Sequence, residues 1–259
     1  MNMDGLDLSI LGPALLAGIL VLTTHVPMGI KVLERGIVFI DLAIAQMAGV
    51  GIIAADMLGL PMHGVSVQLV ATATAMAGAL LLAWLEKRYA ESLEALIGIL
   101  FVLAASISII LLSKNPHGGE YLKDLLVGQI LWVSPHDLIP AACIYAAILI
   151  LWRLFGQRIT GVLFYLLFAI MVTASVQLIG VYLVFASLII PALTVMRVRR
   201  FRILSGYGLG VAGYAVGLIT SALFDLPTGA IIVCSIALLS LVFTALNAHG
   251  SVPPRTMKP

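Results

Sequence analysis

The chain has 259 residues, of which 62% are hydrophobic and only 10% are charged. Soluble domains carry about 25% charged residues, so this composition excludes a soluble globular protein and indicates an all-α protein that crosses a membrane several times. The net charge of +2 comes from short basic clusters between apolar segments, which gives no reason to expect a nucleic-acid partner.

Nine apolar segments with the length of a membrane span, or slightly less, follow one another along the chain. They cover residues 8–30, 37–60, 66–85, 95–113, 137–154, 161–176, 178–196, 205–224 and 228–247. Residues 161–196 suit two short crossings with a break near Gly180 better than one long helix. The sequence therefore predicts a bundle of eight or nine transmembrane helices, including a short broken or re-entrant pair, and nine is the preferred number.

The basic residues divide the predicted loops into two sets. Because Lys and Arg mark cytoplasmic loops, nine crossings place the N-terminus outside and the C-terminus in the cytoplasm, whereas eight would put a basic loop on the wrong side. Residues 1–247 are then one transmembrane domain, and residues 248–259 form a short cytoplasmic tail. The loops expected on the cytoplasmic side contain Lys31 and Arg35, Lys87 and Arg88, Arg153 and Arg158, and Arg197, Arg199, Arg200 and Arg202.

Residues 114–137 form an external loop in this topology. The loop contains an apolar patch at residues 125–133 that is too short to cross the bilayer. We therefore expect a re-entrant or interfacial helix there.

Polar residues inside the predicted spans are the candidates for function, because such groups are costly in a membrane. His25 and Asp41 are predicted at similar depth from the cytoplasmic side, and Gln46 follows within the second span. Asp41 is expected to face protein or water, with His25 as its partner. The alternatives are a hydrogen bond from Asp41 to His25 or to the backbone that only packs the bundle, and a proton-coupled role for both residues.

The chain contains no GxxxxGK[ST], HExxH or GxSxG motif, so nothing in it indicates an ATPase, a metalloprotease or a hydrolase. If ATP drives the protein, another polypeptide must hydrolyse it. We expect no enzymatic activity from this chain and no cofactor bound to it.

Several segments resemble a known family. They are ESLEALIGILF from Glu91, KDLLVGQILWVSPHDL from Lys123, QLIGVYLVFASLIIPALTVMRV from Gln177, and the Pro227, Thr228, Gly229 triplet. Together they are similar to the ABC-3 family, the metal-uptake permeases of bacterial ABC transporters. The resemblance implies a homodimeric permease of the bacterial inner membrane that works with a cytoplasmic ABC ATPase dimer and an extracytoplasmic solute-binding protein. It implies import of zinc or manganese by alternating access, with ATP bound by the partner subunit.

The resemblance also assigns site residues. Residues 27–51 align with a family pattern whose Asp and His, one helical turn apart, resemble a divalent-metal station; here they fall on Leu42 and Gln46. Leu42 offers no ligand and Gln46 only a carbonyl oxygen, so the expected pathway residues are Asp41, Gln46 and His25. The alternative cargo is a chelated metal or another small solute. The expected contacts to the ATPase are Pro191, Ala192, Arg197, Arg199, Arg200 and Arg202.

Overall fold

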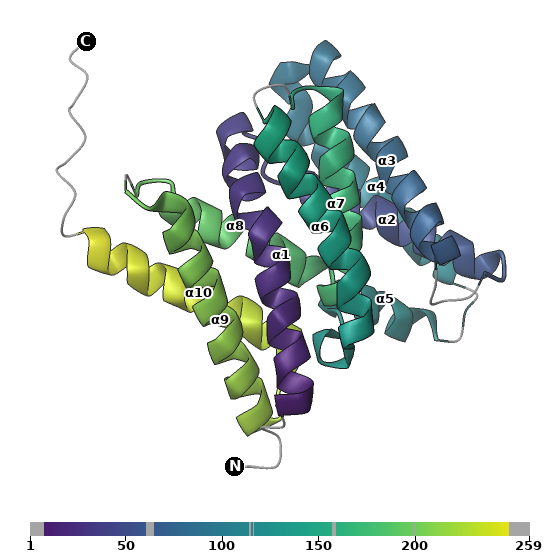
Figure 1. The fold of residues 1–259 in the computed structure, drawn as a ribbon. Helices are drawn as coiled ribbons and strands as arrows, with labels where there is room; N and C mark the ends of the chain where they lie inside the picture. The colour runs from purple at the N-terminus through teal and green to yellow at the C-terminus, as the bar shows by residue number, and fades with distance from the viewer. Residues whose placement is uncertain are drawn as a thin grey trace, which may run out of the picture.

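The computed structural model describes residues 8–60, 65–113, 115, 117–156, 159–198 and 200–248. Within these ranges every regular element is helical, which confirms the all-α prediction (Figure 1). The predicted tail at residues 249–259, and also Arg158 and Arg199, lie outside the described residues. The elements are α1 (Leu8–Arg35), α2 (Ile40–Met57), α3 (Val65–Arg88), η2 (Ala90–Ser92), α4 (Leu93–Leu112), α5 (Gly118–Val127), η3 (Ile130–Trp132), α6 (Pro135–Phe155), α7 (Val162–Ile179), α8 (Val181–Val195), α9 (Arg202–Phe224) and α10 (Thr228–Ala248).

All nine predicted apolar segments are helices, and α5 is an additional short one. Eight of the described helices are long and apolar enough to cross a membrane, whereas α8 has only 15 residues. At 1.5 Å per residue α8 spans about 22 Å, less than the ~30 Å hydrocarbon core. The predicted short pair is therefore α7 followed by α8.

The chain reverses direction between α7 and α8. The guanidinium of Arg35, at the end of α1, lies 4.0 Å from the centre of the Phe164 ring in the first turn of α7. Ala192 and Val195, near the end of α8, pack with Ile30 of α1. The start of α7 and the end of α8 therefore lie beside the same end of α1, so α8 runs back along the direction of α7. Eight of the described helices meet the requirements of a span, and a ninth crossing through α8 stays a prediction.

The break between α7 and α8 is a contact between two glycine backbones. Gly128, which ends α5, and Gly180 have φ values of +74° and +78°. A Cβ atom on either glycine would overlap the backbone of the other segment. Leu125 of α5 packs close to Gly49 of α2, because a Cβ atom on Gly49 would lie 4.0 Å from Leu125 Cδ1. The apolar patch after α4 therefore enters the bundle, as a re-entrant segment does.

Helix α1 extends five residues beyond the predicted end and passes through Pro27. A proline inside a helix leaves the carbonyl four residues earlier without its usual partner, here that of Thr23. The hydroxyl of Tyr207 in α9 donates a hydrogen bond to this carbonyl at 2.9 Å. A residue distant in sequence thus supplies the hydrogen bond that the Thr23 carbonyl lacks because of Pro27.

Small residues allow α9 to approach its neighbours closely, because it carries two pairs of glycines spaced four residues apart. Gly206 and Gly210 face Val26 and Leu22 of α1, and the second pair, Gly213 and Gly217, faces α10. Helix α9 therefore packs between α1 and α10, which is visible in Figure 1.

Candidate functional site

Asp41 lies in the first turn of α2. Its side chain is buried, with only 1% exposed. The carboxylate faces the backbone N–H groups of Asp41 and Leu42, but neither oxygen makes a hydrogen bond of normal geometry within the described residues. A buried carboxylate without a firm partner is costly, so this position is the first candidate for a functional role.

Glu94, in the first turn of α4, is a second carboxylate that interacts electrostatically with Asp41. Its Oε1 atom accepts a hydrogen bond from the Phe39 N–H at 3.2 Å, and its buried Oε2 atom has no partner in the described part of the chain. Phe39 directly precedes α2, so Glu94 places negative charge where the helix dipole favours it. No described Lys or Arg forms an ion pair with either carboxylate. Two acids therefore lie at the start of α2 without a counter-ion among the described residues.

His25 does not pair with Asp41, so that prediction is wrong. The Nδ1 atom lies 2.9 Å from the carbonyl oxygen of Val21 and 3.2 Å from the hydroxyl of Thr24, and the ring packs edge-on to Tyr145. The Nε2 atom is buried and has no partner among the described residues. His25 lies ten residues before the end of α1, about 15 Å along the helix axis. The extension of α1 through Pro27 thus puts the imidazole much deeper in the bundle than Asp41.

Gln46 occupies a third location, 6% exposed, beside a small enclosed cavity. The cavity has room for about one water molecule. Its walls come from α2, α4, α5, α7 and α8, and they include Ser108, Leu125 and Val181. Gln46 is therefore next to the contact between the end of α5 and the start of α8, but Asp41 and His25 do not line this cavity.

The structure thus keeps the three expected pathway residues apart. No group of three His, Cys, Asp or Glu side chains that could hold a metal ion is found in the described ranges. Whether Asp41, Gln46 and His25 serve transport in turn remains a prediction.

One end of the bundle gathers the basic ends of several helices. Arg35 of α1 pairs with Glu86 of α3 at 3.8 Å. Arg202, the first residue of α9, pairs with Glu34 of α1 at 3.3 Å. These contacts join helix ends that the sequence analysis placed on one side of the membrane, and we call this part of the molecule the basic end.

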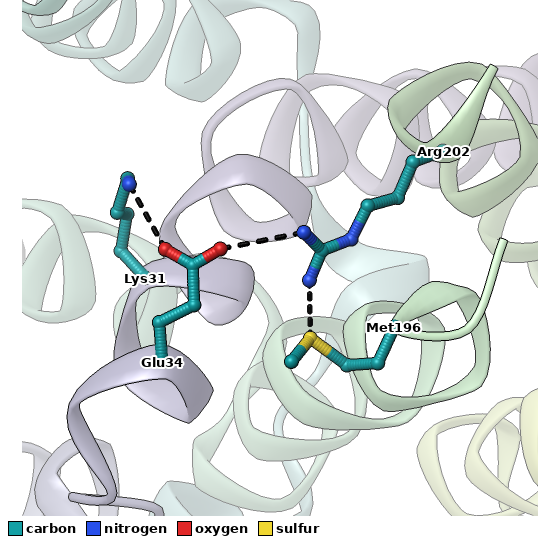
Figure 2. Close-up of polar contacts among 4 residues, drawn as sticks. All are labelled: Lys31, Glu34, Met196 and Arg202. Atoms are coloured by element: carbon teal, nitrogen blue, oxygen red, sulfur yellow. Dashed lines mark hydrogen bonds and ion pairs between the residues drawn. The ribbon is translucent and has the colours of Figure 1, made fainter. Parts of the chain in front are cut away.

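Figure 2 shows Arg202 between α1 and the end of α8. One amino group of Arg202 contacts Glu34 Oε1, and the other contacts the sulfur of Met196, directly after α8. The second carboxylate oxygen of Glu34 accepts a hydrogen bond from Lys31 at 2.9 Å. Arg202, at the start of α9, therefore contacts both α1 and the residue after α8, and it does not project freely.

The other residues expected to contact an ATPase differ in exposure. Pro191 and Ala192 are buried inside α8, where Ala192 approaches Gly29 of α1. Arg197 and Arg200 are exposed between α8 and α9. The described residues between the two helices, 197, 198, 200 and 201, contain no further helix, and we call the range 197–201 the connecting segment.

A family model for the ABC 3 transport family matches this sequence over residues 7–164 and 155–247. The chain belongs to the ABC 3 transport family. The match covers all ten described α-helices except Ala248, the last residue of α10.

Individual proteins similar to this ABC 3 family member carry metal-transport names. The chain is 27% identical to "Manganese transport system membrane protein MntC" of Halalkalibacterium halodurans, over 92% of this chain and 88% of that protein. It is 28% identical to "Probable iron transport system membrane protein" of Haemophilus influenzae, over 63% of this chain and 66% of that protein. The solved structure of PsaBC from Streptococcus pneumoniae in complex with a Fab has the same fold, with a TM-score of 0.75 at 23% identity, over 96% of this chain and 98% of that one.

Leu42 and Gln46 are the positions at which the resemblance led us to expect Asp and His. Leu42 lines an open apolar groove with Phe39, Ile99 and Leu103, and the described residues that line this groove offer no side-chain ligand for a metal. Gln46 faces the small cavity described above. In this family member the two positions therefore do not form a charged station.

Glu34, Glu94 and Tyr207 were not predicted as residues of the site. Glu34 and Glu94 each lie next to a predicted helix end, where a charged residue is ordinary, and Tyr207 looks like one more aromatic residue in an apolar segment. The only available signal was that Pro27 requires an outside donor for the Thr23 carbonyl. Nothing in the sequence identifies Tyr207 as that donor.

Proposed function

We propose that this ABC 3 family member is the membrane-spanning permease subunit of an ATP-binding-cassette importer for a divalent metal ion, zinc or manganese. The observation that carries the proposal is the family match over residues 7–247. The metal-transport names of relatives aligned over much of the chain support the cargo class. The chain contributes no ATPase motif, so a partner subunit hydrolyses the ATP.

The proposed assembly is a homodimer in the bacterial inner membrane, with the N-terminus outside and the basic end in the cytoplasm. Exposed Arg197 and Arg200 of the connecting segment suit a docking surface for two ATPase subunits. An extracytoplasmic solute-binding protein delivers the cargo on the opposite side. Movement of the ATPases then alternates access to the pathway.

Within the permease, we assign the clearest pathway role to Asp41. A cation that leaves toward the cytoplasm meets the buried carboxylate of Asp41 and the half-buried carboxylate of Glu94, neither of which has a counter-ion in the described part of the chain. Carboxylate oxygens suit manganese and also bind zinc. Gln46 lies further along α2 and adds a neutral oxygen.

A second candidate keeps the ABC machine and changes the cargo to a chelated metal or another small solute. The observation that favours it is the loss of ligands at Leu42 and Gln46, together with the absence of a three-ligand cluster in the described ranges. A free ion would then find only a weak station on α2. Binding assays with free and chelated metal separate the two candidates.

The test is uptake of radiolabelled Zn²⁺ and Mn²⁺ into proteoliposomes that contain this subunit, its ATPase and its binding protein. We expect saturable, ATP-dependent uptake that Asp41→Asn abolishes at normal expression. Asp56→Asn, at the other end of the same helix, is the matched control and should retain uptake. Unchanged uptake in Asp41→Asn would remove Asp41 from the pathway, and uptake driven by a proton gradient without ATP would replace the importer by a secondary transporter.

A further inference from the structure

The end of α1 is fastened to the start of α9 by polar contacts at two levels. Tyr207 donates to the Thr23 carbonyl at 2.9 Å, and Arg202 pairs with Glu34 at 3.3 Å. Between them, Gly206 lies directly against Val26. Residues 27–35, the part of α1 after its proline, therefore follow any displacement of the first turns of α9.

The same part of α1 is joined rigidly to α2. The connection has only four residues, 36–39, and backbone hydrogen bonds run from Gly36 to Leu33, from Ile37 to Val32 and from Ile40 to Ile37. Phe39 then stacks on Phe185 of α8. A shift of the end of α1 is therefore passed on to the first turn of α2, where Asp41 lies.

Arg202 links the connecting segment to residues 27–35 of α1. It directly follows residues 197–201 and contacts both Met196 before the segment and Glu34 of α1. The Arg202 and Glu34 side chains are 27% and 38% exposed. A partly exposed ion pair contributes little to the stability of the fold. The role of this pair therefore comes from its location, where it connects the first residue of α9 with the end of α1.

We propose that residues 27–35 of α1 carry movement from the connecting segment to Asp41 at the start of α2, and that the ion pair between Arg202 and Glu34 is the contact that transmits it. This inference rests on the proposed function, in which an ATPase moves the connecting segment. Glu34 and Arg202 are positioning residues in this scheme. Neither touches the cargo.

The test uses the complete transporter in proteoliposomes and measures metal uptake per ATP hydrolysed, with radiolabelled Mn²⁺ and Zn²⁺ as probes. We expect Glu34→Gln and Arg202→Gln each to lower this ratio by about fivefold or more, and the double variant to be no worse than either single one. Arg202→Lys, which keeps the charge, should recover part of the ratio. Lys87→Gln and Glu91→Gln, which change exposed charges at the end of α3 and in η2, are the matched controls.

A second measurement does not depend on turnover. Hydrogen exchange of the complex, with and without a non-hydrolysable ATP analogue, should show nucleotide-dependent changes at residues 197–201 and at residues 36–46. In Glu34→Gln the change at residues 36–46 should disappear while the change at residues 197–201 remains. Tyr207→Phe, which removes only a hydroxyl, should weaken the same response if Glu34→Gln does not assemble.

The outcomes separate the two levels of the argument. If the native complex shows no ATP-driven uptake, the proposed function fails and this inference fails with it. If the native complex transports but the variants keep their uptake per ATP, or residues 36–46 still respond to nucleotide in Glu34→Gln, the function stands and the inference is wrong.

Discussion

Replacing Gly180 by alanine tests the contact on which the pair α7 and α8 depends. Gly180 has φ +78° and ψ 163°, a backbone conformation almost restricted to glycine, which costs about 1–3 kcal/mol for other residues. The new Cβ would also lie less than 3.0 Å from backbone atoms of Val127 and Gly128. Because backbone cannot rotate away as a side chain can, the end of α5 must move, which adds about 1–3 kcal/mol. We expect a total loss of about 2–6 kcal/mol in the free energy of unfolding.

Two other glycines separate the contributions. Gly161 also has a positive φ, +53°, but a Cβ there meets nothing within 4 Å, so Gly161→Ala should cost only the conformational part. Gly208 lies inside α9 with open space beside it, so Gly208→Ala should be neutral or stabilising by about 0.5–1 kcal/mol. The expected order of stability is Gly208→Ala, then Gly161→Ala, then Gly180→Ala.

The assay is thermal unfolding of the purified chain in one detergent, with Gly128→Ala as a second probe of the same contact. Gly128→Ala should resemble Gly180→Ala, since its Cβ would meet Ile179 and Gly180 from the other side. Equal stability of Gly180→Ala and Gly161→Ala would refute the argument, because the backbone contact between α5 and the break would then contribute nothing.

Two further predictions concern tyrosines. Tyr214→Phe removes the buried hydrogen bond of 2.8 Å between the Tyr214 hydroxyl and Ser187, so we expect the free energy of unfolding to fall by about 0.6–1.7 kcal/mol. Tyr182→Phe, at a half-exposed side chain, is the control and should lose no stability in the same thermal unfolding assay. Equal stability of the two variants would contradict this prediction. Burial, assisted by the charge of Asp56, raises the pKa of Tyr121 to about 12, above its ordinary value near 10. Because the pKa of Tyr121 is higher in the folded state, unfolding releases a proton above pH 10, and the free energy of unfolding falls there as the pH rises. Between pH 9 and 11 the Tyr121→Phe variant should therefore lose less stability than the native chain, which chemical unfolding at several pH values measures. Identical pH profiles would show that the phenol is not buried.

The helices were predictable because their signal is local. The apolar segments and the break at Gly180 can each be recognised from consecutive residues, and all nine predicted segments are helices in the predicted order. The positions of basic residues also predicted that the ends of α1 and α3 share one side, which the pair between Arg35 and Glu86 supports.

The candidate site was less predictable because it depends on contacts distant in sequence. The first span was predicted to end at residue 30, but α1 continues to Arg35, and Tyr207, 184 residues from Thr23, donates a hydrogen bond to the Thr23 carbonyl that Pro27 leaves without a partner in the helix. The extension moved His25 away from Asp41, so one misplaced helix end removed the expected pair. Arg202 likewise looked like a free docking residue, although Glu34, 168 residues away, binds it.

The wrong end of α1 and the wrong expectation of a free Arg202 have one physical origin, which is the contact between α1 and α9. The polar partners that correct both of them, Tyr207 and Arg202, lie in the first two turns of α9 and both attach to α1. Helix α1 after Pro27 therefore has its direction set by α9 and not by its own sequence alone. Because α2 follows after four residues, the position of Asp41 is set by the same contacts. A carboxylate held in this indirect way can change its surroundings when α9 moves, whereas His25, bonded to Val21 within its own helix, cannot respond in the same manner.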